Sequence, residues 1–302
     1  MTSLVDGSPR SAGSLTLSPL AFGTWRFVDA NLDEPQGVRV AALDLGLTMV
    51  DTADVYGLDW GGTAFGQAEE LIGRVLADAP ALRDRMVLAT KGGILPPVPY
   101  DSGRIRQACE DSLRRLRVDT IDLYQIHRPD LFTHPAPLAA ELTALREAGK
   151  IREVGVSNHT VDQYDALAAH LPFPIVTTQP QFSAGHLDPV RDGTFDRCLR
   201  DGVVPLAWSP LMGGALTPGA DPGAHGPRPE LLALLDELAE REGVDRSVVA
   251  LAFVLAHPAA PVAIIGSMNS QRIEAATRAL GVRLDRADCY RIIEASEGVP
   301  LP

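Results

Sequence analysis

Four residues whose side chains can exchange protons stand at or just after the ends of apolar runs in the first half of the chain. Asp51 ends the run LTMV, Lys91 ends MVLAT and His127 ends IDLYQI, while Tyr56 follows Asp51 by five residues. A phenol has a pKa of about 10, and a nearby ammonium favours its ionised form. A neutral imidazole can donate a hydrogen bond to a carbonyl oxygen. The four side chains predict a general acid that protonates a carbonyl oxygen as it becomes an alkoxide.

None of these four side chains can supply a hydride, so the predicted reaction needs a nicotinamide cofactor. Lys91 leaves a second reaction open, because a lysine beside a phenol can form a Schiff base with a carbonyl, as aldolases do. Each residue taken alone has an ordinary explanation as a cap, a packed ring or a solvated charge. Their occurrence in consecutive units of one fold favours the catalytic interpretation.

Composition and charge exclude several classes of protein. The chain has 302 residues, of which 45% are hydrophobic, and a net charge of −12 argues against a nucleic-acid partner. The three cysteines are far apart and the histidines lack ligand spacing, so we assign no metal. The longest apolar run, residues 248–256, is too short to span a membrane, and the N-terminal residues do not resemble a signal peptide. We therefore expect a cytoplasmic protein that acts on a small molecule.

Strand-like and helix-like segments alternate along the chain. Because parallel strands need a crossover, alternation implies parallel pairing, and eight strand–helix units in about 250 residues predict an α/β fold of the (β/α)8 TIM barrel type. We expect one such domain over residues 1–302. A doubly wound sheet is the alternative, but no G-x-G-x-x-G motif follows the first strand. The predicted strands cover residues 18–25, 47–51, 86–91, 121–127, 151–157, 174–179, 203–209 and 261–267. The predicted helices cover residues 35–46, 68–78, 102–118, 137–150, 160–170, 187–202, 229–243, 245–258 and 269–280.

The barrel explains why the four residues should meet. Catalytic groups in such barrels lie at the carboxyl ends of the strands, which is where the sequence places Asp51, Lys91 and His127. The Pro/Gly-rich stretch at 211–228 follows the seventh strand and is long for a connection. We predict that it is a loop on the cofactor side of the active site.

Seven stretches resemble the aldo-keto reductase family. They are DTADVYG (51–57), TKGG (90–93), HRPD (127–130), GKIREVGVSN (149–158), TQPQFS (178–183), AWSPLMGG (207–214) and IIGSMNSQRIEAA (264–276). The resemblance implies an NADPH-dependent carbonyl reductase in which Tyr56 is the general acid, supported by Asp51, Lys91 and His127. It also implies a monomer, because the chain looks most like bacterial monomeric members of that family.

The same resemblance implies a set of cofactor contacts. Beside the nicotinamide ribose would lie Gly23, Thr24 and Trp25, with Asp51 close by. Around the carboxamide would lie Ser157, Asn158 and Gln179, with the ring of Phe182 stacked on the nicotinamide. Around the pyrophosphate would lie Ser209, Leu211, Gly213 and Gly214. At the adenosine 2′-phosphate would lie Ser267 and Arg272.

The chain departs from the family pattern at three places. Phe182 stands where many members have tyrosine, and Gly266 replaces a basic residue that often assists the 2′-phosphate. Ala275 and Ala276 replace a Glu-Asn pair that usually contacts adenine. Arg272 is then the main charge left for the 2′-phosphate, and its planar guanidinium suits that ligand. We expect NADP rather than NAD, with a weaker hold on adenine than is typical.

The substrate pocket is predicted from Trp25, Tyr56, Trp60, His127 and Arg128. Aromatic walls favour apolar or aromatic carbonyls. Arg128 would either attract a substrate carboxylate or pair with the nearby Asp130. A regulatory NADP-binding subunit on the reductase fold stays open as a further alternative to an enzyme.

Overall fold

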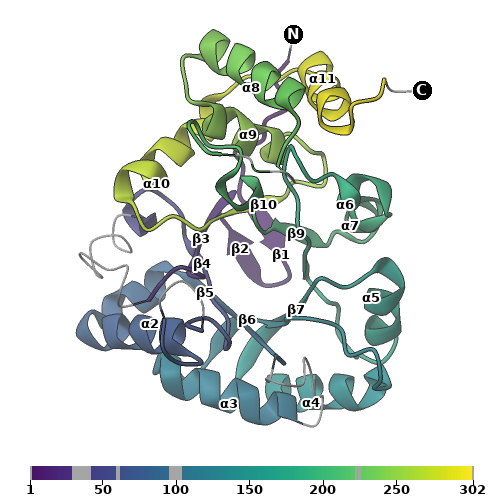
Figure 1. Ribbon diagram of the computed structural model, residues 1–302. Helices are drawn as coiled ribbons and strands as arrows, with labels where there is room; N and C mark the ends of the chain where they lie inside the picture. The colour runs from purple at the N-terminus through teal and green to yellow at the C-terminus, as the bar shows by residue number, and fades with distance from the viewer. Residues whose placement is uncertain are drawn as a thin grey trace.

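A closed ring of eight parallel strands forms the centre of the computed structural model (Figure 1). The structure describes residues 2–28, 42–58, 62–94, 104–221, 223 and 226–300. The order of strands around the ring is β10-β3-β4-β5-β6-β7-β8-β9, so consecutive strands are neighbours and the last pairs with the first. The predicted (β/α)8 barrel is therefore confirmed. The strands are β3 (Leu20–Gly23), β4 (Met49–Asp51), β5 (Val87–Gly92), β6 (Ile121–Ile126), β7 (Ile151–Ser157), β8 (Thr177–Gln179), β9 (Val204–Ala207) and β10 (Val262–Ile265).

Helices connect successive strands and pack on the outside of the ring (Figure 1). Among the described residues, none of these helices combines the length and the apolar character needed to cross a membrane. The first predicted helix, 35–46, lies mostly outside the described residues. The helices are α2 (Gln67–Asp78), α3 (Ile105–Leu116), α4 (Pro135–Glu147), α5 (Val161–Ala168), α6 (Asp188–Arg191), α7 (Thr194–Asp201), α8 (Pro229–Glu242), α9 (Arg246–Leu255), α10 (Ser270–Thr277) and α11 (Arg286–Glu297).

Three features of the fold were not predicted. A hairpin of β1 (Arg10–Ala12) and β2 (Leu15–Leu17) precedes the barrel, and α11 follows it. The single helix predicted over 187–202 is two helices, α6 and α7, because Gly193 between them has a φ of 86°. That left-handed conformation suits glycine and interrupts a helix.

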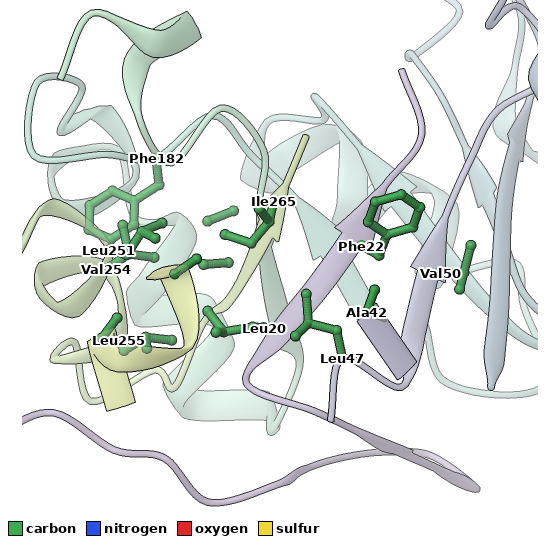
Figure 2. Packing of buried hydrophobic residues seen from close by; sticks show 14 of the residues in the cluster. Leu20, Phe22, Ala42, Leu47, Val50, Phe182, Leu251, Val254, Leu255 and Ile265 are labelled. Atoms are coloured by element: carbon green, nitrogen blue, oxygen red, sulfur yellow. The ribbon is translucent and has the colours of Figure 1, made fainter. Parts of the chain in front are cut away.

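The apolar residues form two cores separated by the wall of the barrel. One core lies inside the ring, where the hairpin residues Leu15 and Leu17 pack with inward residues such as Met49 and Leu123. The other lies between the strands and the helices, where Phe22 of β3 and Leu251 of α9 are buried (Figure 2). Side chains of a strand point alternately to the two sides, so each barrel strand serves both cores. This alternation decides which polar residues can reach the interior.

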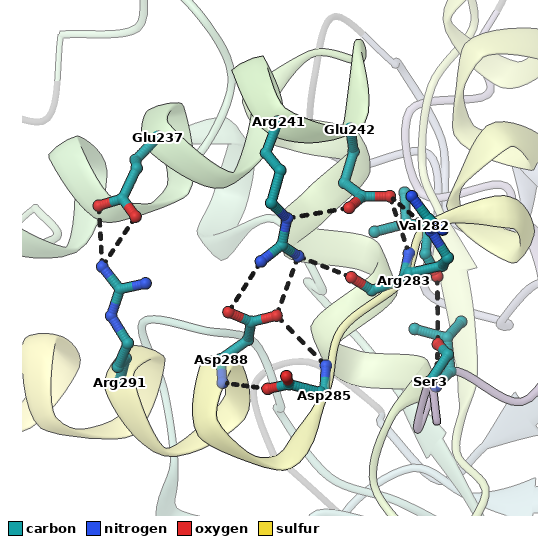
Figure 3. Close-up of polar contacts among 10 residues, drawn as sticks. Ser3, Glu237, Arg241, Glu242, Val282, Arg283, Asp285, Asp288 and Arg291 are labelled. Carbon is teal, nitrogen blue, oxygen red and sulfur yellow. Dashed lines mark hydrogen bonds and ion pairs between the residues drawn. The ribbon is translucent and has the colours of Figure 1, made fainter. Parts of the chain in front are cut away.

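Helix α11 is held against α8 by a cluster of charged side chains (Figure 3). The guanidinium of Arg241 donates to Asp288 Oδ1 at 3.0 Å, to Glu242 Oε1 at 2.9 Å and to the carbonyl of Arg283 at 2.7 Å. Asp288 also closes a capping box with Asp285, in which each side chain accepts from the other residue's backbone N–H. The side chain of Asp288 is only 8% exposed, so these contacts are shielded from water.

We expect Asp288→Ala to lower the free energy of unfolding by about 1–2 kcal/mol, because it removes half of the capping box and leaves Arg241 with fewer acceptors. Chemical denaturation measures this difference. Glu237→Ala is the matched control, because Glu237 pairs with Arg291 at a more exposed position and should change stability by less than about 0.5 kcal/mol. Equal losses for the two variants would contradict the role given to Asp288.

Candidate active site

Lys91 lies in β5 near its carboxyl end, and its side chain has no exposed surface. Its Nζ donates to Asp51 Oδ2 at 2.6 Å, to the carbonyl of Thr52 at 2.9 Å and to Tyr56 Oη at 3.2 Å. The ammonium has three hydrogens, so each has an acceptor. Lys91 thereby joins the end of β4 to the turn that carries Tyr56.

Asp51 ends β4, and its carboxylate is surrounded by donors. While Oδ2 accepts from Lys91, Oδ1 accepts from Gln125 Nε2 at 3.1 Å and from Gln179 Nε2 at 3.0 Å. The two amides also contact each other, with Gln179 Nε2 at 3.2 Å from Gln125 Oε1. Asp51 is 2% exposed, and a carboxylate at that depth needs such partners.

Gln125 was not singled out from the sequence, although a signal was present. It lies two residues before His127 in an otherwise mostly apolar strand, and residues two apart point to the same side of a strand. Leu123, two residues earlier, belongs to the interior core. Counting by twos therefore places Gln125 inside the barrel, next to Asp51.

The protonation states of Lys91 and Tyr56 follow from burial and from each other. Burial lowers the pKa of Lys91, but the charge of Asp51 and the contact with Tyr56 outweigh it, so the net pKa is raised. Burial raises the pKa of Tyr56, and the attraction of Lys91 reverses only part of that rise. The sequence predicted that lysine would lower the pKa of the phenol, whereas in the structure burial dominates. Tyr56 is therefore a neutral phenol that still carries its proton at neutral pH.

His127 follows β6, and its ring meets the ring of Tyr56 edge-on with 5.9 Å between centroids. Its backbone N–H donates to the carbonyl of Gly92 at 3.1 Å. Burial, then the charges of Lys91 and Arg128, hold its pKa well below the usual value of 6.5, so the imidazole is neutral. Nδ1 is buried and has no hydrogen-bond partner in the described part of the chain. A neutral imidazole beside Tyr56 can donate to a carbonyl oxygen from Nε2.

Phe182 requires a correction, because it does not reach the carboxyl face of the barrel where the cofactor was predicted. Its side chain is 0% exposed, and its ring packs edge-on against Phe195 of α7 with 4.7 Å between centroids. Figure 2 shows it in the outer core beside α9. Counting by twos from Gln179 places residue 182 on the outer side of the barrel. The predicted stacking of Phe182 on nicotinamide is therefore wrong.

Trp208 is an aromatic residue that the sequence analysis missed. It follows β9 by one residue and lies two residues after Leu206, which belongs to the interior core. Its ring is only partly buried, and Nε1 donates to Asn158 Oδ1 at 3.0 Å. Asn158 Nδ2 in turn donates to the carbonyl of His127 at 3.1 Å. Trp208 is thus tied to the loop that follows β6, on the same face as Tyr56.

The residues that were predicted to contact the carboxamide of the cofactor lie together at the ends of β7 and β8. Ser157 Oγ donates to the backbone carbonyl of Gln179 at 3.0 Å and accepts from Asn158 Nδ2 at 3.0 Å. Asn158 is exposed and adopts a left-handed backbone with φ 57°. Both side-chain amides already have hydrogen-bond partners, but Gln179 is only 2% exposed whereas Asn158 is exposed, so Asn158 is the more accessible of the two.

The loop that was predicted to bind the pyrophosphate has free space beside its backbone. Gly213 and Gly214 have φ of 68° and 105°, and a Cβ added to either would meet nothing within 4 Å. Ser209 Oγ accepts from the N–H of Gly213 at 2.6 Å, which shapes the turn, and Leu211 is partly buried beneath it. From the loop after β3, Arg26 Nη2 donates to the carbonyl of Gly213 at 3.4 Å. The loops after β3 and β9 therefore face each other.

The remaining predicted residues are spread around this face. Gly23 ends β3, and Thr24 is buried with its N–H donating to the carbonyl of Asp51 at 3.0 Å. Trp25 is 42% exposed. Trp60 lies outside the described residues. Arg128 is exposed, and the ion pairs found among the described residues do not include one between Arg128 and Asp130.

The two residues predicted for the 2′-phosphate flank the start of α10. Ser267 precedes it, and Asn269 caps it by accepting from the N–H of Arg272. Arg272 is exposed, and its guanidinium makes no hydrogen bond or ion pair with the described residues. The charge is therefore available to an anion.

Comparison with known proteins places these features in one family. The profile of the Aldo/keto reductase family matches residues 19–297. A 6-dehydroglucose reductase from Novosphingobium aromaticivorans is 46% identical over 293 residues, which cover 95% of this chain and 94% of the relative.

Solved structures agree with the fold along its whole length. A glycerol dehydrogenase from Gluconobacter oxydans superposes with a TM-score of 0.80 at 31% identity, covering 100% of this chain and 97% of that one. An aldo/keto reductase from Klebsiella pneumoniae, solved with NADP and acetate, has a TM-score of 0.78 at 24% identity and covers 99% and 97%. Because the profile spans every barrel strand and the strand ends converge on Lys91, the chain belongs to the aldo/keto reductase family.

Proposed function

We propose that this protein reduces an aldehyde or ketone to an alcohol, reversibly, with NADPH as hydride donor and Tyr56 as proton donor. The observation that carries the proposal is the position of Lys91 Nζ, at 3.2 Å from the phenol oxygen of Tyr56 and 2.6 Å from Asp51. A phenol next to a buried ammonium can release a proton to a developing alkoxide, because the ammonium stabilises the phenolate that remains.

Each residue of the site has a separate part in the proposed reaction. Tyr56 donates its proton to the carbonyl oxygen, and Lys91 holds the resulting phenolate by charge and hydrogen bond. Asp51 keeps Lys91 protonated and fixes its direction. His127, as a neutral imidazole, donates a hydrogen bond to the same carbonyl oxygen and orients the substrate toward Tyr56.

The residues on the carboxyl face fit a nicotinamide dinucleotide. When bound, NADPH supplies the hydride that no side chain can. Gly213 and Gly214 offer open backbone to a pyrophosphate, and Arg272 offers an unpaired cation to a 2′-phosphate. Trp208, rather than Phe182, offers a partly exposed ring for the nicotinamide. NADP in the Klebsiella pneumoniae structure supports the choice of this cofactor.

Two classes of carbonyl are candidate substrates. Trp25, which was predicted from the sequence to line the pocket, is exposed, and Trp208, which was not predicted, is partly exposed; both rings favour apolar or aromatic carbonyls. The name of the relative that is 46% identical favours a sugar aldehyde, 6-dehydroglucose. We propose the sugar aldehyde as the better substrate, because identity at that level over nearly the whole chain weighs more than two aromatic rings.

The aldolase alternative is disfavoured by the state of Lys91. A Schiff base needs an unprotonated amine, whereas the pKa of Lys91 is raised by Asp51 and Tyr56 and each of its three hydrogens has an acceptor. The monomeric state and the cytoplasmic location stay predictions of the sequence.

The first test is oxidation of NADPH, followed by absorbance, with 6-dehydroglucose and with 4-nitrobenzaldehyde. We expect Tyr56→Phe to lower kcat by about 10²- to 10⁴-fold on both, because the proton donor is lost. KM and the Kd for NADPH should change by less than about 3-fold. Tyr290→Phe, at an exposed position on α11, is the control and should leave kcat unchanged. A Tyr56→Phe variant with the wild-type rate would show that the proposed proton donor is wrong.

Arg272→Ala should raise the Kd for NADPH by about tenfold and leave the Kd for NADH unchanged, because only NADPH carries the 2′-phosphate. Quenching of tryptophan fluorescence measures both constants. Arg278→Ala removes another exposed cation, one that donates to the carbonyl of Gly243, and should affect neither. Equal weakening of both cofactors by Arg272→Ala would rule out the assignment.

The variants Trp208→Leu and Phe182→Leu distinguish a ring that stacks on the nicotinamide from a ring that packs in the outer core. We expect Trp208→Leu to raise the Kd for NADPH by about 3- to 10-fold, the worth of one aromatic contact, with little change in stability. Phe182→Leu should instead lower the free energy of unfolding by about 1–2 kcal/mol and leave the Kd unchanged, because its ring lies in the outer core. The opposite pattern would restore Phe182 as the stacking residue.

A further inference from the structure

Asp54 is a buried acid that lies next to the catalytic residues. The proposed reaction gives Asp54 no part. It lies in the turn between Asp51 and Tyr56 and is 0% exposed. A carboxyl group is costly to bury, so its presence at this depth calls for a role or for strong compensation.

Asp54 joins the turn that carries Tyr56 to the strand end that carries Lys91. Its backbone N–H donates to the carbonyl of Lys91 at 2.9 Å, and its Oδ2 accepts from the N–H of Gly93 at 3.3 Å. One residue therefore holds the chain on both sides of Gly92. The turn itself is closed by the N–H of Tyr56, which donates to the carbonyl of Ala53 at 3.2 Å. The backbone segments that carry Tyr56 and Lys91 are therefore hydrogen-bonded to each other through Asp54.

The charged side chains near Asp54 do not stabilise a second buried carboxylate in addition to Glu69. Glu69 of α2 is also 0% exposed, and it takes the available cation, Arg115 of α3, at 2.7 Å as well as the hydroxyl of Thr90 at 2.5 Å. Asp54 Oδ1 is buried and has no hydrogen-bond partner among the described residues. One guanidinium thus faces two acids, and one oxygen of Asp54 lacks a donor.

Burial and the charge of Glu69 raise the pKa of Asp54 well above its usual value of 3.8, against smaller opposite effects of Arg115 and the backbone. This shift favours the protonated, neutral form of Asp54. On the other side of the turn, a charged Asp54 would add to Asp51 in raising the pKa of Tyr56, against Lys91. A neutral Asp54 adds no second negative charge beside Tyr56, so the effect of Lys91 on the pKa of Tyr56 is opposed by Asp51 and not by Asp54 as well.

We propose that Asp54 is a positioning residue that clamps the Tyr56 turn to the Lys91 strand end, through its backbone N–H and through a carboxyl oxygen that accepts from Gly93. The proposal rests on the reductase function proposed above. It requires an oxygen acceptor at this position and does not require a negative charge.

The test compares Asp54→Ala, which removes the acceptor, with Asp54→Asn, which keeps an oxygen for Gly93 and stays neutral. We expect Asp54→Ala to lower kcat by about tenfold or more with KM changed less than about 3-fold, because misplaced groups slow the chemical step. Asp54→Asn should recover kcat to within about 3-fold of the wild type. Glu70→Ala, at the exposed neighbour of Glu69 on α2, is the control and should match the wild type.

A second readout needs no substrate. The folded-state pKa of Asp54 is raised, so its contribution to stability is fully present below 3.8 and is lost as the pH rises through the folded value. Asn does not titrate. The melting temperature of Asp54→Asn relative to the wild type should therefore increase between pH 5 and pH 9.

Three results would overturn the proposal. They are a wild-type kcat in Asp54→Ala, a kcat in Asp54→Asn as low as in Asp54→Ala, and a melting difference that does not change with pH. If circular dichroism shows that Asp54→Ala is unfolded, Asp54→Ser replaces it, because a serine hydroxyl is too short to reach Gly93. A wild type that reduces no carbonyl refutes the proposed function, whereas an active wild type with unaffected variants refutes only the role of Asp54.

Discussion

The ion pair between Lys91 and Asp51 is the interaction on which the site depends. Neither side chain is appreciably exposed, and a buried charge is tolerated only when a partner and hydrogen bonds satisfy it. Asp51 is satisfied by two amides, from β6 and β8, and Lys91 by three oxygens. Groups from β4, β5, β6 and β8 thus meet at one carboxylate and one ammonium. Loss of either charge would leave the other unpaired in the barrel interior.

The closed barrel brings these charged and amide groups together for two reasons. Parallel strands end at the same face, which brings Asp51 and Lys91 together although forty residues separate them. Alternation of side chains then selects which residues reach the interior. Gln125 and Trp208 share the inner side with apolar residues two positions away, while Phe182 falls on the outer side. Aromatic character alone does not distinguish Trp208 from Phe182.

Burial and charge together keep Tyr56 and His127, the two hydrogen-bond donors of the site, neutral. Burial raises the pKa of Tyr56 and keeps the phenol protonated, while burial and the charge of Lys91 lower the pKa of His127 and keep its imidazole unprotonated. Their neutrality leaves the Lys91–Asp51 pair as the charged part of the centre. A carbonyl oxygen would meet two neutral donors there, with a cation behind one of them. Such an arrangement favours the charge that develops on that oxygen over the uncharged ground state.

The sequence by itself determined the barrel, the order of its strands and the positions of Asp51, Tyr56, Lys91 and His127, because periodicity and strand ends are properties of local sequence. The tertiary structure decided what depends on depth and on distant neighbours. It placed Phe182 in the outer core, tied Trp208 to Asn158, and joined Gln125 and Gln179 to Asp51. It also reversed the expected shift of the Tyr56 pKa, since the cost of burying a phenolate exceeds the attraction of one ammonium. That balance cannot be read from residue types, because it depends on how much water the fold excludes.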